Sequence, residues 1–323
     1  MAERFNRRSF LRKLIALSPV MCFPVSLSFA SNRNIFRQSS LFMGTVVTID
    51  LANVSRDQSD EYFAKVFELG KNLTKIFNRF DSDSQVSYLN NTGKLEDASI
   101  HIINVLKKSI ELNSLTNKSF DVTILPLVEL LQKDKVSSKE ISEILEYIGT
   151  NLVDINNKKV LFKRQGVQIT FDGIAKGYIA DLMSKALIEL GCKNHLINAG
   201  GDIVAKGYKD TGLFWKIAIQ DPNGKHNYPQ IIDLKDQSIA TSAQYINQSH
   251  LVNALKCKKS SMYSTSIIAP TCMEADAWAT ACSVMDIKSS LNISEINKNY
   301  ASFMIDEKNN IFSSNNWKML VNN

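Results

Sequence analysis

Thr170-Phe171-Asp172-Gly173-Ile174-Ala175-Lys176-Gly177-Tyr178 decides the fold of this chain, together with Asn198-Ala199-Gly200-Gly201-Asp202, which follows one expected helix later. The order predicts a strand, a tight turn, a helix, a second strand and a second glycine turn. Glycines without a Cβ let the backbone approach a ligand or a metal closely, and Lys176 adds a positive charge beside that backbone. The pattern therefore predicts a site that holds phosphate groups.

The rest of the chain predicts one folded body in which helices and strands are combined. A first strand is expected over 41–51, and apolar residues at helical spacing up to Phe77 predict a helix that ends near 78–83. Ser137-x-x-Glu140 has the pattern of a capping box and predicts the start of a helix that stops at Gly149. The other expected elements are helices over 99–115, 127–132, 179–190 and 274–285, a hairpin over 153–162, strands over 215–220, 231–234, 238–241, 245–255 and 263–268, and a closing helix and hairpin near Trp317.

Length and composition permit a globular enzyme and argue against two other classes. With 323 residues and 44% hydrophobic content the chain can bury a large core, which excludes a mainly disordered protein. The net charge of +6 invites a nucleic-acid-binding role, yet residues 1–30 hold five basic side chains against one acidic side chain. Without that segment the net charge is +2, so we expect no nucleic-acid partner.

The N-terminus reads as an export address. The run Asn6-Arg7-Arg8-Ser9-Phe10-Leu11-Arg12-Lys13 precedes an apolar stretch over 14–29 that Pro19 and Pro24 interrupt. It resembles a twin-arginine export signal, with an ordinary secretory signal or a single membrane anchor as alternatives. We expect a signal peptide over 1–30, a short lead over 31–40 and the main folded domain over 41–323.

Twin-arginine export carries proteins that are already folded, so the signal bears on function as well as on location. We expect a periplasmic protein that uses the twin-arginine export machinery and is held at the inner membrane if the signal stays uncleaved. Cys22 belongs to the expected signal, and the other cysteines lack a metal-ligand spacing such as Cys-x-x-Cys. Two disulfides are compatible with the periplasm, but a protein folded before export does not need them. We therefore expect mostly free, partly buried thiols at Cys192, Cys257, Cys272 and Cys282.

A second constellation is Glu274-Ala275-Asp276-Ala277-Trp278-Ala279-Thr280. On a helix, Asp276 and Thr280 are four residues apart and share one face, while the alanines between them permit close packing. A carboxylate and a hydroxyl are hard oxygen ligands that suit Mg²⁺ when a backbone carbonyl completes the set. The alternative is that the two residues simply form a pair at the start of a helix.

Together with four further blocks, these constellations resemble the ApbE-type FAD:protein FMN transferases. The resemblance covers residues 41–285 and implies an α+β fold, in which a single large domain has mixed and antiparallel sheets flanked by helices, similar to the T-fold. The blocks are Met43-Gly44-Thr45, 77–90, Ser119-Phe120-Asp121, 173–178, 198–202, Thr241-Ser242 and 276–280.

The resemblance also implies an activity, in which FAD and Mg²⁺ are used to attach FMN to a threonine of a periplasmic or membrane-associated flavoprotein, with release of AMP. Asp276, Thr280 and the backbone oxygen of Gly173 match the metal ligands of the family. His250 matches a histidine suited to take the hydroxyl proton, and Asp276 is the second catalytic candidate. The residues expected to line FAD are Met43, Phe80, Ser119, Phe120, Asp121, Asp172, Lys176 and Leu251.

Two departures from the family pattern affect the flavin side. Thr170 stands where the family has an aspartate, and Asp172 stands where it has a glycine. Since positions two apart share one side of a strand, Asp172 either replaces the lost carboxylate or caps the following helix. Phe80 replaces a common tyrosine, which keeps ring stacking but loses a hydroxyl contact.

A third departure follows His250, where residues 253–257 replace the usual Asp-Pro and Thr-Gly loop and Ala243 replaces a glycine after Ser242. These changes leave two rival functions open. One is an exported FAD carrier or a metal-dependent FAD hydrolase that releases FMN and AMP. The other is a periplasmic module that binds a different phosphate compound without any chemistry.

Overall fold

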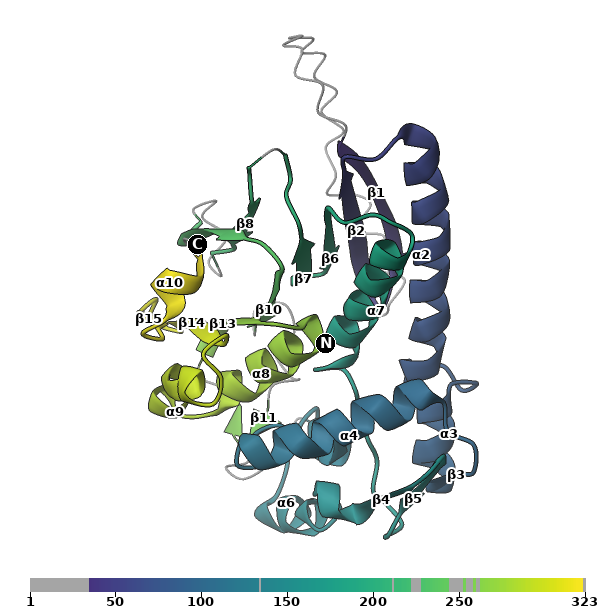
Figure 1. The fold of residues 1–323 in the computed structure, drawn as a ribbon. Helices are drawn as coiled ribbons and strands as arrows, with labels where there is room; N and C mark the ends of the chain where they lie inside the picture. The colour runs from purple at the N-terminus through teal and green to yellow at the C-terminus, as the bar shows by residue number, and fades with distance from the viewer. Residues whose placement is uncertain are drawn as a thin grey trace, which may run out of the picture. The chain divides into compact units, whose positions relative to one another are not determined.

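An antiparallel sheet of eight strands forms the centre of the protein in a computed structural model (Figure 1). The structure describes residues 35–133, 135–210, 212–221, 228–243, 252–253, 258–259 and 262–321. Neighbouring strands in the sheet are antiparallel throughout. In spatial order the strands are β1 (Ile35–Phe42), β2 (Thr45–Ala52), β6 (His195–Ala199), β7 (Asp202–Lys206), β10 (Gln237–Ala243), β13 (Met262–Ala269), β14 (Ala301–Asp306) and β15 (Ile311–Ser313).

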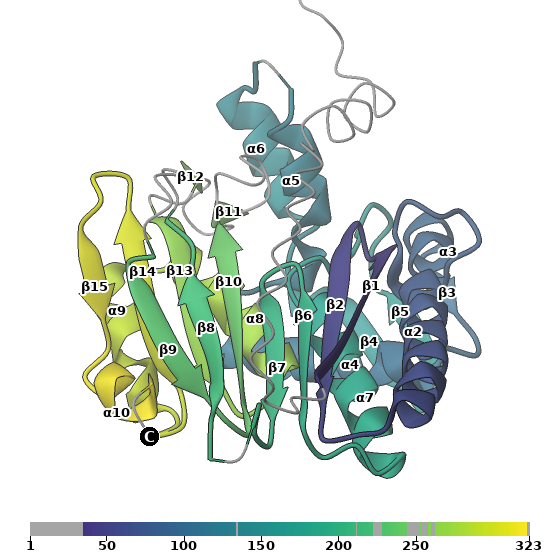
Figure 2. The same ribbon diagram turned by 90° about the horizontal axis from the view of Figure 1, so that it is seen from above.

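Three helices cover one face of this sheet (Figure 2). They are α2 (Arg56–Phe77), α7 (Ala175–Glu189) and α8 (Cys272–Val284). Val47, Ile49 and Leu51 alternate along β2 and are fully buried in the core shared with these helices. α7 contacts both α2 and α8, so the glycine-rich stretch at its start lies inside the packed layer.

A hairpin and a short helix cover the opposite face. β8 (Trp215–Ile219) pairs with β9 (Gln230–Leu234), and α10 (Trp317–Val321) packs beside them. Trp215 and Trp317 are 2% exposed and share a second apolar cluster with Ile203 and Ala205 of β7. The middle of the sheet, including β7, is therefore buried on both faces, which explains why β7 is apolar along most of its length.

Several smaller elements complete the fold outside the central sheet. β3 (Lys94–Leu95), β5 (Lys159–Phe162) and β4 (Val153–Asn156) form a small sheet near α3 (Gln85–Thr92) and α4 (Ile100–Leu115). α5 (Leu125–Leu130) and α6 (Ser138–Leu145) share a third apolar cluster. The remaining short elements are α9 (Ile287–Leu291), β11 (Val252–Asn253), β12 (Lys258–Lys259) and 3₁₀ turns over Val122–Ile124, Thr150–Leu152 and Asn292–Glu295. Within the described ranges, no helix is both long and apolar enough to cross a membrane.

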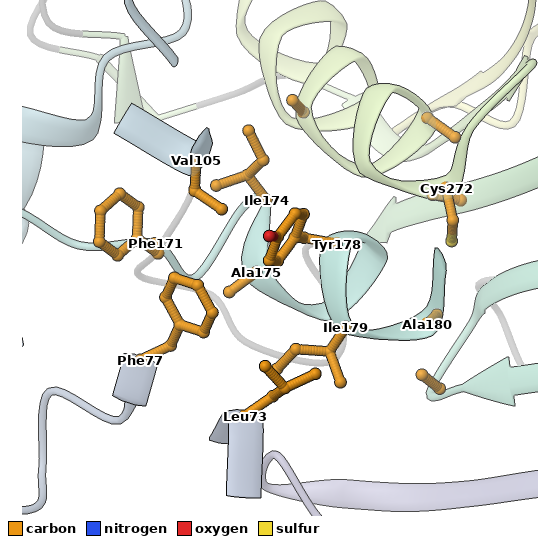
Figure 3. Close-up of a cluster of buried hydrophobic side chains, with 14 of the residues drawn as sticks. Leu73, Phe77, Val105, Phe171, Ile174, Ala175, Tyr178, Ile179, Ala180 and Cys272 are labelled. Carbon is orange, nitrogen blue, oxygen red and sulfur yellow. The ribbon is translucent and has the colours of Figure 1, made fainter. Parts of the chain in front are cut away.

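Aromatic packing fixes the glycine-rich stretch in place (Figure 3). The ring of Phe77, at the end of α2, meets Phe171 edge-on at 5.5 Å and Tyr178 edge-on at 5.8 Å between centroids. These two residues flank the turn at Gly173, so both sides of the turn are anchored to one ring. The hydroxyl of Tyr178 also lies 2.9 Å from Nδ1 of His101 on α4.

The main expectations from the sequence are confirmed. The fold is α+β with antiparallel sheets and flanking helices. The helix expected near 99–115 runs over Ile100–Leu115 with Ser99 as its N-cap, and Ser137 and Glu140 form the expected capping box. Cys192, Cys272 and Cys282 are free and buried, as expected, whereas Cys257 lies outside the described residues.

Two elements differ from expectation. The strand predicted over 41–51 is a hairpin, because Met43 and Gly44 adopt φ values of 54° and 70° and turn the chain between β1 and β2. The strand predicted before Gly173 is absent from the described segment 163–174. There the backbone makes hydrogen bonds that belong to no helix or sheet, such as the one in which the Thr170 N–H donates to the Val122 carbonyl at 2.8 Å. Most of the strand expected over 245–255 lies outside the described residues.

Candidate functional site

The start of α7 packs directly on the start of α8. Gly177 lies so close to Cys272 that an added Cβ would overlap the Cys272 carbonyl oxygen. This approach lets the Gly177 N–H donate to Oδ2 of Asp276 at 3.1 Å. From the middle of α7, the Asp181 carboxylate accepts the N–H groups of Cys272 and Met273, each at 2.8 Å. These bonds satisfy donors that the first turn of α8 would otherwise leave unpaired, and they fix the register of the two helices.

A cluster of buried charges lies between the two helices and β7. Lys176 donates to Asp202 and lies 3.4 Å from both carboxylate oxygens of Asp276. The side chains of Asp202 and Asp276 are 3% and 4% exposed, and that of Lys176 is 29% exposed. The cluster offers a partly accessible ammonium group to phosphate oxygens and carboxylate oxygens to a cation.

The environment shifts the pKa of each group in this cluster. Burial opposes the ammonium charge of Lys176, but attraction to Asp202 and Asp276 outweighs it, so the pKa of Lys176 is raised. Burial also raises the pKa of Asp202 and of Asp276, while the charge of Lys176 counteracts the effect at both carboxyl groups. Lys176 thus stays charged and stabilises the two carboxylates.

The residues predicted to bind a metal lie together. An added Cβ at Gly173 would lie 2.7 Å from Oγ1 of Thr280, one turn beyond Asp276 on α8, and Ser242 Oγ lies 3.5 Å from the same atom. Since Thr271 caps α8 by accepting the N–H of Glu274, the reading of Asp276 and Thr280 as a helix-start pair is wrong. A carboxylate, a hydroxyl and a backbone oxygen are the kinds of donor that Mg²⁺ prefers, so Asp276, Thr280 and Gly173 are the residues that would hold it. In the described part of the chain, no group of three His, Cys, Asp or Glu residues could hold a metal, so a metal here depends on the hydroxyl and the backbone.

Two turns meet at the other side of the cluster. Gly200 and Gly201, between β6 and β7, have φ values of 69° and 103°, which favour glycine. An added Cβ at Gly200 would overlap the hydroxyl of Thr45, so this turn lies against the turn between β1 and β2. The predicted FAD-lining residue Met43 is half-buried in the turn between β1 and β2. The turn at Gly200 and Gly201 leads directly into Asp202.

Phe80 and Asp172 are connected through Arg79. The guanidinium carbon of Arg79 lies 4.0 Å from the centroid of the Phe80 ring, and its Nε donates to Oδ2 of Asp172 at 2.9 Å. The interpretation of Asp172 as a helix cap is wrong, because Ile174 is the N-cap of α7 and makes no side-chain cap bond. Phe80 is 62% exposed at the edge of a cavity of about 310 Å³. Its other lining residues are Arg79, Ser82, Ser87, Asn90, Asn91, Leu125, Glu129 and Gln168.

The block Ser119-Phe120-Asp121 has clear structural contacts. Phe120 is 4% exposed in the main core, and Ser119 is half-buried beside it. Oδ1 of Asp121 accepts the N–H and the hydroxyl of Thr123 at 2.8 and 2.6 Å, and Oδ2 accepts from Asn113 at 3.0 Å. Burial raises the pKa of Asp121, although these hydrogen bonds favour its charged form. The role of these three residues in lining FAD stays a prediction.

Two predicted residues, the base candidate His250 and the flavin-lining candidate Leu251, lie outside the described residues, as do 254–257 of the altered loop. Three other residues belong to the site but had no assigned role in the sequence interpretation, namely Arg79, Asp181 and Asp202. Asp202 ends the second glycine block and Arg79 precedes Phe80, so their positions in the motifs were the available signal. For Asp181 the sequence offered no signal beyond its place on the expected helix that became α7.

The family model for the ApbE family matches residues 43–304 of the chain. The chain belongs to the ApbE family. The ApbE match spans the glycine-rich stretch, the charge cluster and the predicted metal ligands, so the whole site described above lies within it.

Known relatives and solved structures agree with this ApbE assignment. The FAD:protein FMN transferase of Haemophilus influenzae is 26% identical, with 96% of this chain and 99% of the relative covered. The enzyme of the same name from Escherichia coli is 25% identical, with 75% of this chain and 76% of the relative covered. The flavin transferase ApbE from Vibrio cholerae superposes with a TM-score of 0.80 at 24% identity, covering 89% of this chain and 99% of its own. The ApbE protein from Thermotoga maritima also has a TM-score of 0.80 at 24% identity, covering 90% of this chain and 100% of its own. These structures establish a shared fold.

Proposed function

We propose that this ApbE-family protein uses FAD and Mg²⁺ to attach FMN to a threonine hydroxyl of a target protein, with AMP as the leaving group. Flavin transfer from FAD to protein is supported by membership of the family and by the name of a relative that matches over nearly its whole length. The observation that carries the finer proposal is the meeting of Gly173 and Thr280 beside the half-buried Lys176 and the buried Asp276.

In this reaction the acceptor oxygen forms a bond to the phosphorus of the FMN half. The bond between that phosphorus and the oxygen of the AMP phosphate breaks, and AMP leaves with that oxygen. We assign the removal of the hydroxyl proton to His250. Lys176 binds phosphate oxygens through its charge, and Phe80 orients a ring of FAD by stacking.

A metal fits beside these groups at Asp276, Thr280 and the backbone oxygen of Gly173. When bound, Mg²⁺ supplies positive charge that stabilises the charge building up on the phosphate oxygens. Positioning and electrostatic stabilisation provide most of the catalysis in phosphoryl transfer. The rigid α7–α8 contact therefore matters because it holds Lys176 and Asp276 in one arrangement.

We assign the target to the flavoproteins of the periplasm or of the membrane facing it. The support is the twin-arginine pattern around Arg7 and Arg8. A protein that reaches its compartment already folded carries this site in its final geometry. The net charge of the chain without that signal supports a protein acceptor and no nucleic acid.

The test is an assay of the full chain with FAD, MgCl₂ and an acceptor protein that carries a threonine in an exposed segment. We expect the acceptor to gain the mass of one FMN and flavin fluorescence, and the same acceptor with alanine at that threonine to gain neither. Replacing Asp276→Asn removes a charged metal ligand, so we expect the rate to fall at least about 100-fold. A fully active Asp276→Asn variant would contradict the metal assignment.

The same assay separates the rival functions. Consumption of FAD with release of free FMN and AMP, and an acceptor of unchanged mass, would indicate hydrolysis. Binding of FAD without consumption would indicate a carrier. Chelation of the metal with EDTA is expected to stop the transfer, and restoring MgCl₂ is expected to recover it.

A further inference from the structure

Arg79 makes two interactions that join the two departures from the family pattern on the flavin side, at Phe80 and Asp172. Its guanidinium group lies over the Phe80 ring at 4.0 Å and donates to Asp172 at 2.9 Å. A second carboxylate, that of Glu129, lies 3.9 Å from Nη1. One side chain therefore contacts the aromatic ring expected at the flavin and the carboxylate that directly precedes Gly173.

The setting of Arg79 restricts its motion. Its side chain is 9% exposed, whereas Asp172 and Glu129 are 48% and 52% exposed. The hydroxyl of Ser87 donates to the Arg79 carbonyl at 3.0 Å, which ties the backbone of the loop to α3. A nearly buried cation held at both backbone and side chain is more ordered than a surface arginine, and its planar group suits simultaneous stacking and ion pairing.

We propose that Arg79 is a positioning residue that sets the Phe80 ring for FAD and couples it to the Gly173 turn. In this chain the Arg79 contact takes over the orienting role that the lost tyrosine hydroxyl would have had, and Asp172 serves as its ionic partner. The proposal rests on the proposed function, since it assumes that FAD is the ligand.

The cavity beside Phe80 supports this role. Arg79 and Phe80 both line the space of about 310 Å³, with Asn90 and Gln168 among the polar groups around it. Asn90 also holds the chain before the turn, since its side chain donates to the Ile169 carbonyl at 2.9 Å and accepts the Ile169 N–H at 2.8 Å. A ligand in this cavity would meet the ring and the arginine on a wall that other bonds keep in place.

The test compares Arg79→Gln with a matched control. Arg164 makes the same two kinds of contact elsewhere, with its guanidinium carbon 4.8 Å from the Tyr147 ring centroid and Nη2 2.6 Å from Glu146. FAD affinity of the full chain is measured by quenching of flavin fluorescence, without an acceptor. We expect Arg79→Gln to weaken FAD binding roughly three- to tenfold, and Arg164→Gln to leave it within about twofold of the unsubstituted chain.

Further readouts separate positioning from general stability. In the transfer assay, Arg79→Gln is expected to raise KM for FAD more than it lowers kcat, and Arg79→Lys, which keeps the charge without the planar stack, is expected to recover part of the affinity. Asp172→Asn removes only the ionic partner of Arg79, so we expect a smaller loss of FAD affinity. This variant tests the same proposal if Arg79→Gln fails to fold.

The outcomes distinguish this proposal from the function on which it rests. If the unsubstituted chain does not bind FAD, both the proposed function and the role of Arg79 are wrong. If it binds FAD and the Arg79→Gln and Asp172→Asn variants bind equally well, only the role of Arg79 is overturned. Equal losses in the Arg79→Gln and Arg164→Gln variants would also overturn it, because the effect would then not be specific to this wall of the cavity.

Discussion

His195 is a single residue whose protonation the interior of the protein controls. It is fully buried on β6, where Nδ1 lies 3.0 Å from the Cys192 carbonyl and Nε2 lies 2.7 Å from the hydroxyl of Ser184. A carbonyl can only accept, so Nδ1 carries the proton and Nε2 accepts from the hydroxyl. Burial lowers the pKa of His195 to about 4, although the bond to the Cys192 carbonyl favours the charged form.

We expect His195 to make the stability of the protein depend on pH. The unfolded chain binds a proton at this residue below about pH 6.5, whereas the folded chain does so only below about pH 4. The contribution of the neutral His195 to the free energy of unfolding is therefore complete above pH 6.5 and is lost as the pH falls from 6.5 to 4. The full loss is about 3 kcal/mol. Urea unfolding at pH 7 and pH 4.5 should show a smaller difference for His195→Gln than for the unsubstituted chain, and equal differences would contradict the assignment.

The contact between α7 and α8 is the element-scale feature that assembles the site. Lys176 and Gly177 come from one helix, and Asp276 and Thr280 come from the other. The helices can approach because Gly177 has no side chain. Asp181 fixes the position of the first turn of α8 along α7 by accepting two of its N–H groups. The same contact thus serves stability and chemistry.

Gly177→Ala tests this contact. Alanine favours a helix over glycine by about 1 kcal/mol, but here its Cβ would overlap a backbone carbonyl that cannot rotate away. We expect a net loss of about 2 kcal/mol in the free energy of unfolding. The matched control is Gly70→Ala in α2, where the Cβ would meet the flexible end of Met183 and the ring of Phe42, and the expected loss is smaller. Similar unfolding midpoints for the two variants in urea would show that the α7–α8 contact is not tight.

At the scale of the whole molecule, the way the site is built is compatible with the proposed export in the folded state. Its residues come from α7, α8, β7 and the turn between β1 and β2, which are far apart in the sequence and meet only after folding. A cofactor site of this kind can be completed in the cytoplasm only if the protein is exported in the folded state. The arginine pair near the N-terminus is consistent with such a route.

Export is tested by changing Arg7→Lys and Arg8→Lys together in the full chain. Because twin-arginine recognition depends on the arginine pair, we expect the variant to accumulate in the cytoplasm in folded form, while the unsubstituted chain reaches the periplasm. Cell fractionation followed by immunoblotting measures the distribution. An unchanged periplasmic fraction would favour an ordinary secretory signal.

Local patterns predicted much of the fold and part of the site. Ser137 and Glu140 identify a helix start because both residues of a capping box lie within one turn. Asp276 and Thr280 could be placed on one face of a helix for the same reason, since four residues make about one turn. The hairpin at Met43 and Gly44 was missed because apolar alternation continues across the turn, where only the φ values reveal it.

The sequence by itself determined most of the elements, the face of α8 that carries the metal candidates and the family resemblance, because each of these depends on short local patterns of residues. Only the tertiary structure decided that Asp202 pairs with Lys176 and that Asp172 pairs with Arg79 and does not cap α7. Such pairings join residues from separate elements and depend on where the packed core places their backbones. No local pattern encodes that placement, because it results from the burial of side chains along the whole chain.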